Sequence, residues 1–329
     1  FYSVFFGYIL FLLYFCSMKQ LLNHIISHLR GYFPEEELRE LAYWIVEETT
    51  AMTRTQILTT HEQVPIPHLD AILQRLRNYE PIQYIFGHTE WMGLHLNVTP
   101  ATLIPRPETA ELIDWILNTC DTQSPLRVMD IGTGSGCIAI ALKKSASKWQ
   151  VTRVDISHEA LAVAKENAER NHVEVYWQQM DILSPIANNR LPIADIIVSN
   201  PPYICEKEKV DMEARVLDYE PASALFVPDD DALLFYRRIA SLKAAKMLFF
   251  EINEAYGEQV CTMLREMGYT DIELKENTEG ILITWQLDTG AGNMYKDQRM
   301  IFKPDDCDRP RTLTQVLQKR YDSISNISG

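Results

Sequence analysis

From residue 106 onward, short apolar runs alternate with stretches of helical periodicity, and this alternation constrains the fold more than any other feature of the sequence. It predicts strands at 126–131, 150–155, 173–177, 195–199, 246–252 and 272–274. It predicts helices at 108–117, 137–144, 158–170, 231–242 and 254–267. Strands that alternate with helices form a parallel, doubly wound sheet, which binds ligands beyond the carboxyl ends of its strands. We therefore expect an α/β, Rossmann-like domain whose site residues directly follow strands.

The chain before residue 106 follows a different pattern. Apolar residues recur at helical spacing through residues 18–83, which predicts a small helical domain. Residues 84–105 contain short extended segments around a glycine turn, and they predict a hairpin linker. The α/β domain should then occupy residues 106–304, followed by a polar tail at 305–329. A length of 329 residues suits this two-domain arrangement.

Residues 1–17 carry no charge and are apolar except for Ser3, Gly7 and Ser17. The run is shorter than the roughly 20 residues that a membrane-spanning helix needs, and it lacks the basic segment that opens a signal peptide. An amphipathic helical pattern begins at Met18. We therefore expect Met18 to be the natural start, residues 1–17 to be a non-native hydrophobic segment, and the protein to have no membrane association.

The six cysteines lie far apart, with no C-x-x-C pair and no cluster with histidine. This spacing argues against a zinc site and a disulfide framework, so we expect no metal and a reducing, cytoplasmic setting. Thirty-one basic residues against forty-five acidic ones give a net charge of −14. A chain this acidic is not expected to bind nucleic acid by charge.

The first predicted strand ends in a glycine-rich turn, DIGTGSG, that opens a helix. Glycines allow close approach of a ligand to the backbone, and the helix N-terminus offers free N–H groups. The spacing is not the G-x-G-x-x-G of dinucleotide sites, and the acid ahead of the glycines would suit a cationic amino-acid ligand better than a pyrophosphate. A tight turn without a ligand is the alternative. The predicted binding residues are Asp130, Gly132, Thr133, Gly134, Ser135 and Gly136.

Two further acids follow the next two strands. Asp155 lies 25 residues after Asp130, the placement at which an acid accepts hydrogen bonds from a ribose diol, although it could instead only cap the following helix. Asp181 could accept a hydrogen bond from an adenine amino group, with a plain loop acid as an almost equal alternative.

The sequence NPPY, from Asn200 to Tyr203, follows another apolar strand. Two prolines cannot extend a central strand, so the chain must turn and leave backbone carbonyls unpaired by the sheet. The Asn200 side-chain oxygen and the Pro201 carbonyl could accept both hydrogens of a planar –NH₂ group while Tyr203 packs on its flat face. We predict that Asn200, Pro201, Pro202 and Tyr203 bind the substrate; the alternative is a merely rigid turn.

DIGTGSG, VDIS at 154–157 and SNPPYI at 199–204 together resemble the class I S-adenosylmethionine-dependent methyltransferases. With TLIPRPET at 102–109 and the helical N-terminal pattern, the chain resembles more narrowly the HemK/PrmC family of release-factor glutamine methyltransferases. The resemblance extends from about residue 18 to 274. Its closing region departs from the family pattern, because TEGILITWQLDTGAGN precedes MYKDQRMIFKP, which leaves the last strand pairing open.

The resemblance implies S-adenosylmethionine as cofactor, with its methionine part on residues 132–136, its ribose on Asp155 and its adenine beside Asp181 and Ile182. Asn200 is expected to contact the cofactor as well as the substrate. It implies that the NPPY segment holds the glutamine of the Gly-Gly-Gln loop of a peptide chain release factor. Asn200, Pro201 and Tyr203 are the expected catalytic residues, and no general base is apparent. The alternatives are a nucleic-acid adenine amino-methyltransferase, which would flip a base into the same pocket, and a binding protein without catalysis.

Overall fold

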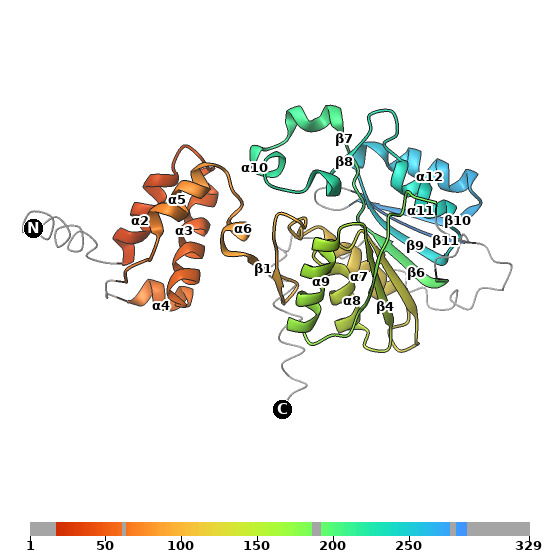
Figure 1. Ribbon diagram of the computed structural model, residues 1–329, viewed down its shortest axis with the longest axis horizontal. Helices are drawn as coiled ribbons and strands as arrows, with labels where there is room; N and C mark the ends of the chain where they lie inside the picture. Colours follow the sequence, from red (N-terminus) through yellow and green to blue (C-terminus); the bar gives the residue numbers. More distant parts are fainter. Residues whose placement is uncertain (1–17, 61–63, 186–191, 277–280, 288–329) are drawn as a thin grey trace, which may run out of the picture. The chain divides into compact units, whose positions relative to one another are not determined.

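The computed structural model describes residues 18–60, 64–185, 192–276 and 281–287. Its first part is a group of helices, drawn from red to orange in Figure 1: α2 (Met18–Leu29), α3 (Glu35–Thr50), α4 (Arg54–Thr59), α5 (Leu69–Arg77) and α6 (Ile82–Phe86). Their apolar faces meet in one core that includes Ile25, Leu38, Ile45 and Leu73. The predicted helical periodicity is therefore confirmed in this part of the chain.

Pro81 lies at the N-cap of α6. Proline is tolerated there because the first N–H groups of a helix have no intrahelical partner. A β-hairpin follows, formed by β1 (His88–Trp91) and β2 (Leu94–Asn97). Met92 and Gly93 make its turn with φ angles of 50° and 69°. The hairpin lies within the predicted segment 84–105, although residues 84–86 are helical instead of extended.

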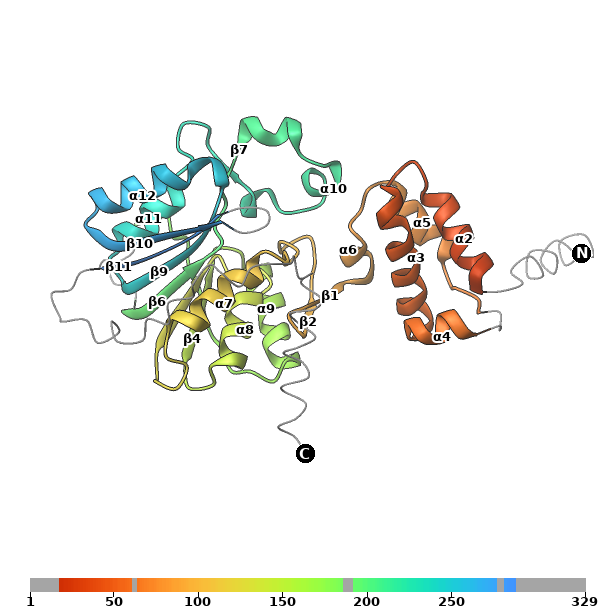
Figure 2. The same ribbon diagram turned by 180° about the vertical axis from the view of Figure 1, so that it is seen from behind.

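The larger part of the molecule contains a seven-stranded sheet in the order β10-β11-β9-β6-β3-β4-β5 (Figure 2). The strands are β3 (Arg127–Ile131), β4 (Gln150–Asp155), β5 (Tyr176–Gln179), β6 (Ala194–Ser199), β9 (Ala245–Ile252), β10 (Tyr269–Glu276) and β11 (Ile281–Leu287). Five of them, from β9 to β5, are parallel neighbours. Strand β11 runs antiparallel between β9 and β10, so the sheet is mixed rather than wholly parallel.

Helices cover both faces of this sheet. Helices α7 (Thr109–Thr119), α8 (Cys137–Ser145) and α9 (His158–Arg170) lie on one face, and α11 (Leu234–Ser241) and α12 (Gly257–Glu266) lie on the other. Successive strand residues belong to opposite cores: Phe249 to the first and Phe250 to the second. A strand buried on both faces must be apolar at nearly every position, which explains the unbroken apolar runs in the sequence. The doubly wound α/β class is confirmed.

Two strands differ from the sequence prediction. Strand β5 begins at Tyr176 instead of residue 173, because the chain is still turning at His172, whose φ is 56°. Strand β11 falls within the segment that departs from the family pattern, so this stretch supplies the antiparallel strand beside β9. MYKDQRMIFKP, the tail at 305–329 and residues 1–17 lie outside the described residues.

The connection between β6 and α11 contains an insertion, residues 204–228, in which the sequence predicted no helix or strand. It holds the short parallel pair β7 (Ile204–Cys205) and β8 (Phe226–Val227), with helix α10 (Ala214–Leu217) between them. In the described part of the chain, no helix combines the length and apolar character needed to cross a membrane.

Candidate active site

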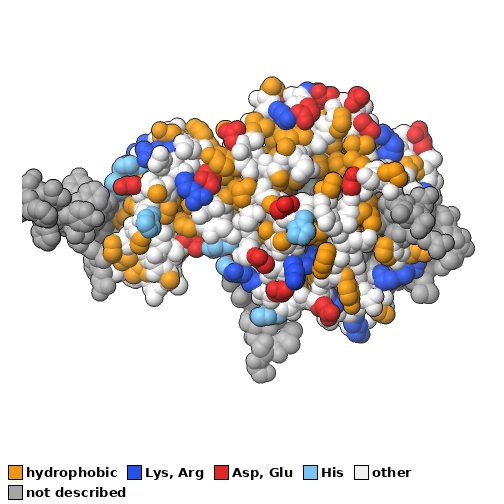
Figure 3. Space-filling model, viewed as in Figure 1, with side chains coloured by type: hydrophobic (Ala, Val, Ile, Leu, Met, Phe, Trp, Pro, Cys, Tyr) orange, Lys and Arg blue, Asp and Glu red, His pale blue; other side chains and the backbone are white. Residues whose placement is uncertain are grey.

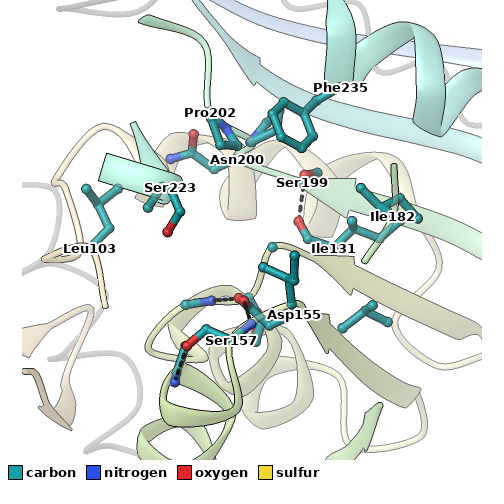
Figure 4. A pocket seen from close by; sticks show the side chains of 18 of the residues that line it. Leu103, Ile131, Asp155, Ser157, Ile182, Ser199, Asn200, Pro202, Ser223 and Phe235 are labelled. Atoms are coloured by element: carbon teal, nitrogen blue, oxygen red, sulfur yellow. Dashed lines mark hydrogen bonds between the residues drawn. The ribbon is translucent and has the colours of Figure 1, made fainter. Parts of the chain in front are cut away.

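A cavity of about 400 Å³ lies at the carboxyl ends of β3, β4 and β6 (Figure 4). One side of it is formed by residues that follow these strands, including Gly134, Asp155 and Asn200. The other side comes from two longer connections, the segment 101–106 ahead of α7 and the insertion 204–228. The cavity is therefore bounded by strand ends on one side and by loop segments on the other.

The turn after β3 requires glycine. Gly132, Gly134 and Gly136 have φ angles of 73°, 53° and 82°, in the left-handed region that residues with a side chain rarely adopt. A Cβ on Gly136 would also lie 3.0 Å from the Cβ of Ala164. The Gly132 N–H donates a hydrogen bond to the Val154 carbonyl at 2.8 Å, which fixes the turn against the end of β4.

The Asp155 carboxylate lines the cavity and is held by two backbone amides. Its Oδ2 accepts a hydrogen bond from Gly134 N, and its Oδ1 accepts one from Ser157 N, both at 2.9 Å (Figure 4). Burial raises the pKa of Asp155, while these amide bonds act in the opposite direction. Each carboxylate oxygen keeps a second lone pair, so the group can still accept from two hydroxyls of a ligand.

Asp130 does not reach the cavity wall. Its side chain is fully buried beneath the turn, where Oδ2 accepts a hydrogen bond from the Thr133 hydroxyl at 2.6 Å. Burial raises its pKa to about 7. The position of Asp130 therefore supports the shape of the turn rather than a direct contact with a cationic ligand, in contrast to the sequence prediction. Thr133 and Ser135, the other polar residues of the turn, do line the cavity.

Asp181 and Ile182 line the same side of the cavity as Asp155. The Asp181 carboxylate accepts hydrogen bonds from Leu183 N and from the Ser184 hydroxyl, and the latter is the main cause of its lowered pKa. Its oxygens are thus partly engaged by their own turn. Next to them, Ile156 and Leu183 are exposed apolar side chains on the cavity wall, and no feature of the sequence had pointed to either. Apolar side chains at this position would suit the flat face of an aromatic base.

At the end of β6, the Ser199 hydroxyl donates to the Ile131 carbonyl at 2.6 Å and ties this strand end to that of β3. Asn200, Pro201 and Pro202 follow and line the cavity. The Asn200 Nδ2 group donates to the Thr109 hydroxyl at 3.4 Å. Because the amide nitrogen is engaged, the side-chain oxygen of Asn200 is the end available to a ligand.

Tyr203 does not lie on the cavity wall, so its position does not support the predicted packing on a substrate amide. It packs against the core beneath the sheet end, and its hydroxyl donates to Glu251 Oε1 at 3.4 Å. Glu251 is itself buried, and its Oε2 accepts from the Thr109 hydroxyl at 2.8 Å. A buried carboxylate thus lies behind the Asn200 amide and interacts with it through Thr109 and directly.

The two loop segments around the cavity are joined by an ion pair. Arg106 Nη2 lies 2.6 Å from Glu220 Oε1, and the Glu220 side chain is only 2% exposed. The other Glu220 oxygen accepts from the Ile104 backbone N–H at 3.3 Å. Glu220 therefore fixes the segment 101–106 against the insertion 204–228.

One feature of the sequence indicates that Glu251 has a special role, but no feature indicates this for Glu220. Glu251 interrupts the apolar run MLFFEI, and an acid within a buried strand is unusual unless it is paired or functional. Glu220 lies in a loop without any periodic pattern.

Comparison with known proteins identifies the family. A release factor glutamine methyltransferase from Bacteroides thetaiotaomicron is 42% identical over 275 residues, which cover 80% of this chain and 97% of that protein. The one from Flavobacterium psychrophilum is 36% identical and matches 80% of this chain and 96% of its own length. This chain belongs to the release factor glutamine methyltransferase family.

The domain families agree with this assignment. Residues 20–87 match the PrmC N-terminal domain, and residues 113–223 match the Methyltransferase small domain. The chain is accordingly an enzyme, a methyltransferase, and its methyl donor is S-adenosylmethionine. In the described part of this methyltransferase, no three His, Cys, Asp or Glu side chains lie close enough together to hold a metal ion.

Likeness to solved structures is weaker. The hMettl16 catalytic domain, solved in complex with MAT2A 3'UTR hairpin 6, matches 59% of this chain and 76% of its own at 18% identity and a TM-score of 0.48. Such a distant likeness carries no argument about the substrate of this methyltransferase.

Proposed function

We propose that this enzyme transfers a methyl group from S-adenosylmethionine to the side-chain amide nitrogen of the glutamine in the Gly-Gly-Gln motif of peptide chain release factors. The observation that carries the proposal is the arrangement of Asn200. Its amide nitrogen is engaged by Thr109, so its oxygen can accept from a substrate –NH₂ group in the cavity that Asp155 and the glycine-rich turn also line. We infer from the names of the relatives that this –NH₂ group belongs to a release factor glutamine.

The residues on the cavity wall fit the cofactor. We assign the methionine part to the turn at residues 132–136 and the ribose hydroxyls to Asp155, whose two oxygens retain acceptor capacity. We assign the adenine to the slot beside Asp181, where Ile156, Ile182 and Leu183 offer apolar contacts. The cofactor supplies a methyl group on a positively charged sulfur.

The protein's part in the reaction is to aim the amide. An amide nitrogen is a poor nucleophile because its lone pair is delocalised into the carbonyl. Acceptance of its two hydrogens by the Asn200 oxygen and the Pro201 carbonyl would favour the localised form and point it in line at the methyl group. No side chain is assigned as a base, and the proton can leave to water after transfer.

The protein substrate needs a docking surface beyond the cavity. The helical part at residues 18–83 bears none of the assigned cofactor or acceptor residues, so we assign it to recognition of the release factor. A release factor works in translation termination, so we assign the enzyme to the cytoplasm. Neither assignment requires contact with nucleic acid.

A nucleic-acid adenine methyltransferase is the less favoured alternative. The net charge is −14, and on the face shown in Figure 3 basic and acidic side chains are interspersed. Binding of a phosphate backbone depends on basic side chains gathered on one face. The names of the relatives also favour the glutamine.

A single experiment separates these functions. The enzyme is incubated with labelled S-adenosylmethionine and, in parallel, with a purified release factor, the same factor with its Gly-Gly-Gln glutamine replaced by alanine, and double- and single-stranded DNA. We expect label in the first sample alone, with mass spectrometry locating one methyl group on that glutamine. Label on DNA, or equal label on the altered factor, would refute the proposal.

A further inference from the structure

We infer that Glu251 is a positioning residue: it sets the direction of the hydrogen-bond relay Glu251–Thr109–Asn200 and so decides which end of the Asn200 amide faces the substrate. The inference rests on the proposed function, because it concerns the acceptor of the glutamine amide. Glu251 does not line the cavity; it acts on Asn200 through Thr109 and through its own interaction with the Asn200 amide.

The three residues come from distant parts of the chain and meet behind the cavity wall. Glu251 lies near the end of β9 and is 6% exposed. The Thr109 hydroxyl, at the start of α7, donates to Glu251 Oε2 at 2.8 Å. The same hydroxyl oxygen accepts from Asn200 Nδ2 at 3.4 Å. The relay therefore runs in one direction, from Asn200 through Thr109 to the carboxylate.

The chemistry of the three groups explains this direction. An ionised carboxylate can only accept hydrogen bonds, and a threonine hydroxyl has a single hydrogen to give. Once Thr109 has given that hydrogen to Glu251, it offers Asn200 only a lone pair. The Asn200 –NH₂ group must then turn toward Thr109, and its oxygen becomes the end presented to the substrate.

A neutral group at position 251 would remove this constraint. A protonated acid or an amide can donate to Thr109, which frees the threonine hydrogen for the Asn200 oxygen. The Asn200 amide can then turn over and present its –NH₂ group to the substrate –NH₂ group. Two donors facing each other cannot hold the glutamine amide, so transfer should slow in that orientation.

The surroundings of Glu251 raise its pKa but leave the carboxyl group ionised at pH 8. Burial raises the pKa of Glu251 to about 6, the neighbouring Glu108 acts in the same direction, and the bonds from Thr109, Asn200 and Tyr203 oppose it. Three other titratable groups act on Glu251 electrostatically or bond to it: Tyr203 after β6, Tyr236 on α11 and Cys137 on α8. Burial raises the pKa of each of these three, so they stay neutral at pH 8.

Charge at this position is costly to stability. A buried carboxylate with a raised pKa is less stable ionised than neutral, and an apolar or amide side chain would avoid that cost. A purely structural role would thus be served better by a neutral residue. In the relay, the ionised carboxylate of Glu251 orients the Asn200 amide, which explains why a charged residue stands at this position.

The test compares Glu251→Gln with the wild type in single-turnover methylation of a release factor at saturating S-adenosylmethionine. We expect the rate at pH 8 to fall by about 10- to 100-fold, from lost orientation of the acceptor. The wild-type rate should decline as the pH falls through about 6, and this acid limb should be absent in the variant. Cofactor affinity and the melting temperature at pH 8 should not fall.

Two further variants isolate the relay. Thr109→Val removes the hydroxyl and should slow transfer, though by no more than Glu251→Gln does, because the carboxylate keeps its own bond from the Asn200 amide. Thr109→Ser keeps the hydroxyl and should restore most of the rate. Asp195→Asn is the matched control, because Asp195 is a buried carboxylate at the opposite end of β6, paired with Arg127. It should leave the acid limb in place.

The outcomes are distinguishable from those of the proposed function. A wild-type enzyme that labels no release factor refutes the proposed function itself. A wild-type enzyme that labels the glutamine, together with a Glu251→Gln variant of equal rate and unchanged acid limb, overturns the relay alone. A rate loss that only follows the fraction of unfolded variant would also overturn it.

Discussion

The Asp155 carboxylate accepts a hydrogen bond from the backbone N–H of Gly134, 21 residues earlier in the chain, at 2.9 Å. The acid assigned to the ribose is therefore oriented by the turn assigned to the methionine part of the same cofactor. Substitution at either position should affect both parts of the site.

Replacement of Asp155 by alanine should weaken S-adenosylmethionine binding by about 1.5 to 3 kcal/mol, because charge-assisted hydrogen bonds to the ribose are lost and Gly134 loses its acceptor. Isothermal titration calorimetry on the two proteins would measure this difference. Glu159→Gln, on the exposed first turn of α9, serves as the control and should bind like the wild type. Equal affinity for Asp155→Ala would contradict the ribose assignment.

Asn200→Ala should lower the methyl-transfer rate by about 10²- to 10³-fold, by analogy with loss of one preorganised polar group. Cofactor affinity should change far less, because the side chain orients the acceptor amide. Asn200→Asp keeps an oxygen acceptor but adds negative charge near the sulfonium, which favours the charged ground state over a transition state in which that charge disperses. It should bind cofactor at least as well and still transfer slowly. Wild-type rates for Asn200→Ala would count against its role.

The ion pair between Arg106 and Glu220 should respond unequally to removal of its two partners. Arg106 is about one-third exposed, whereas Glu220 is almost fully buried. Arg106→Ala leaves a buried charge without its partner and should cost about 3 kcal/mol in unfolding free energy, whereas Glu220→Ala leaves an arginine that water can reach and should cost less. Urea denaturation would measure both values. An equal or reversed order would show that the pair is not buried in solution.

Asp130 should make stability depend on pH. Its folded-state pKa is raised from 3.8 to about 7, so the native state holds this proton more tightly than the unfolded chain does. The stabilisation of the folded state by this proton is therefore fully present below about pH 4 and is lost as the pH rises through about 7. Asp130→Asn stays neutral at every pH, so its stability relative to the wild type should increase across this window. Parallel urea titrations at several pH values test this, and a constant difference would contradict the buried charge.

The cofactor side of the cavity could be predicted from sequence because each of its segments is contiguous and follows a strand. The turn at 132–136, Asp155 and Ile182 all reach the cavity for that reason. Asp130 was misjudged, since a place at a strand end does not reveal whether the side chain points outward or beneath the turn. The start of β5 was misjudged because residues 173–175 are apolar enough for a strand but follow a left-handed residue.

The acceptor side could be predicted only in part. NPPY marks the turn itself, but the bond that orients Asn200 comes from Thr109, 91 residues away, and the bond that orients Thr109 comes from Glu251, 142 residues away. Glu220 likewise meets Arg106 across 114 residues. An acid within the apolar run MLFFEI marks Glu251 as unusual, but no local pattern identifies its partner or that of Glu220, because these partners are set by how distant strands and loops pack together.

This difference between the two sides has a consequence for the folding of the enzyme as it is synthesised. A growing chain that has emerged through residue 183 already contains every segment assigned to the cofactor, whereas Glu251 is made 68 residues later and belongs to a strand that pairs with β6. The residues assigned to the cofactor are therefore present in the chain well before the carboxylate that orients the Asn200 amide has been made. Methyl transfer should thus require that β9, the last parallel strand, has joined the sheet beside β6.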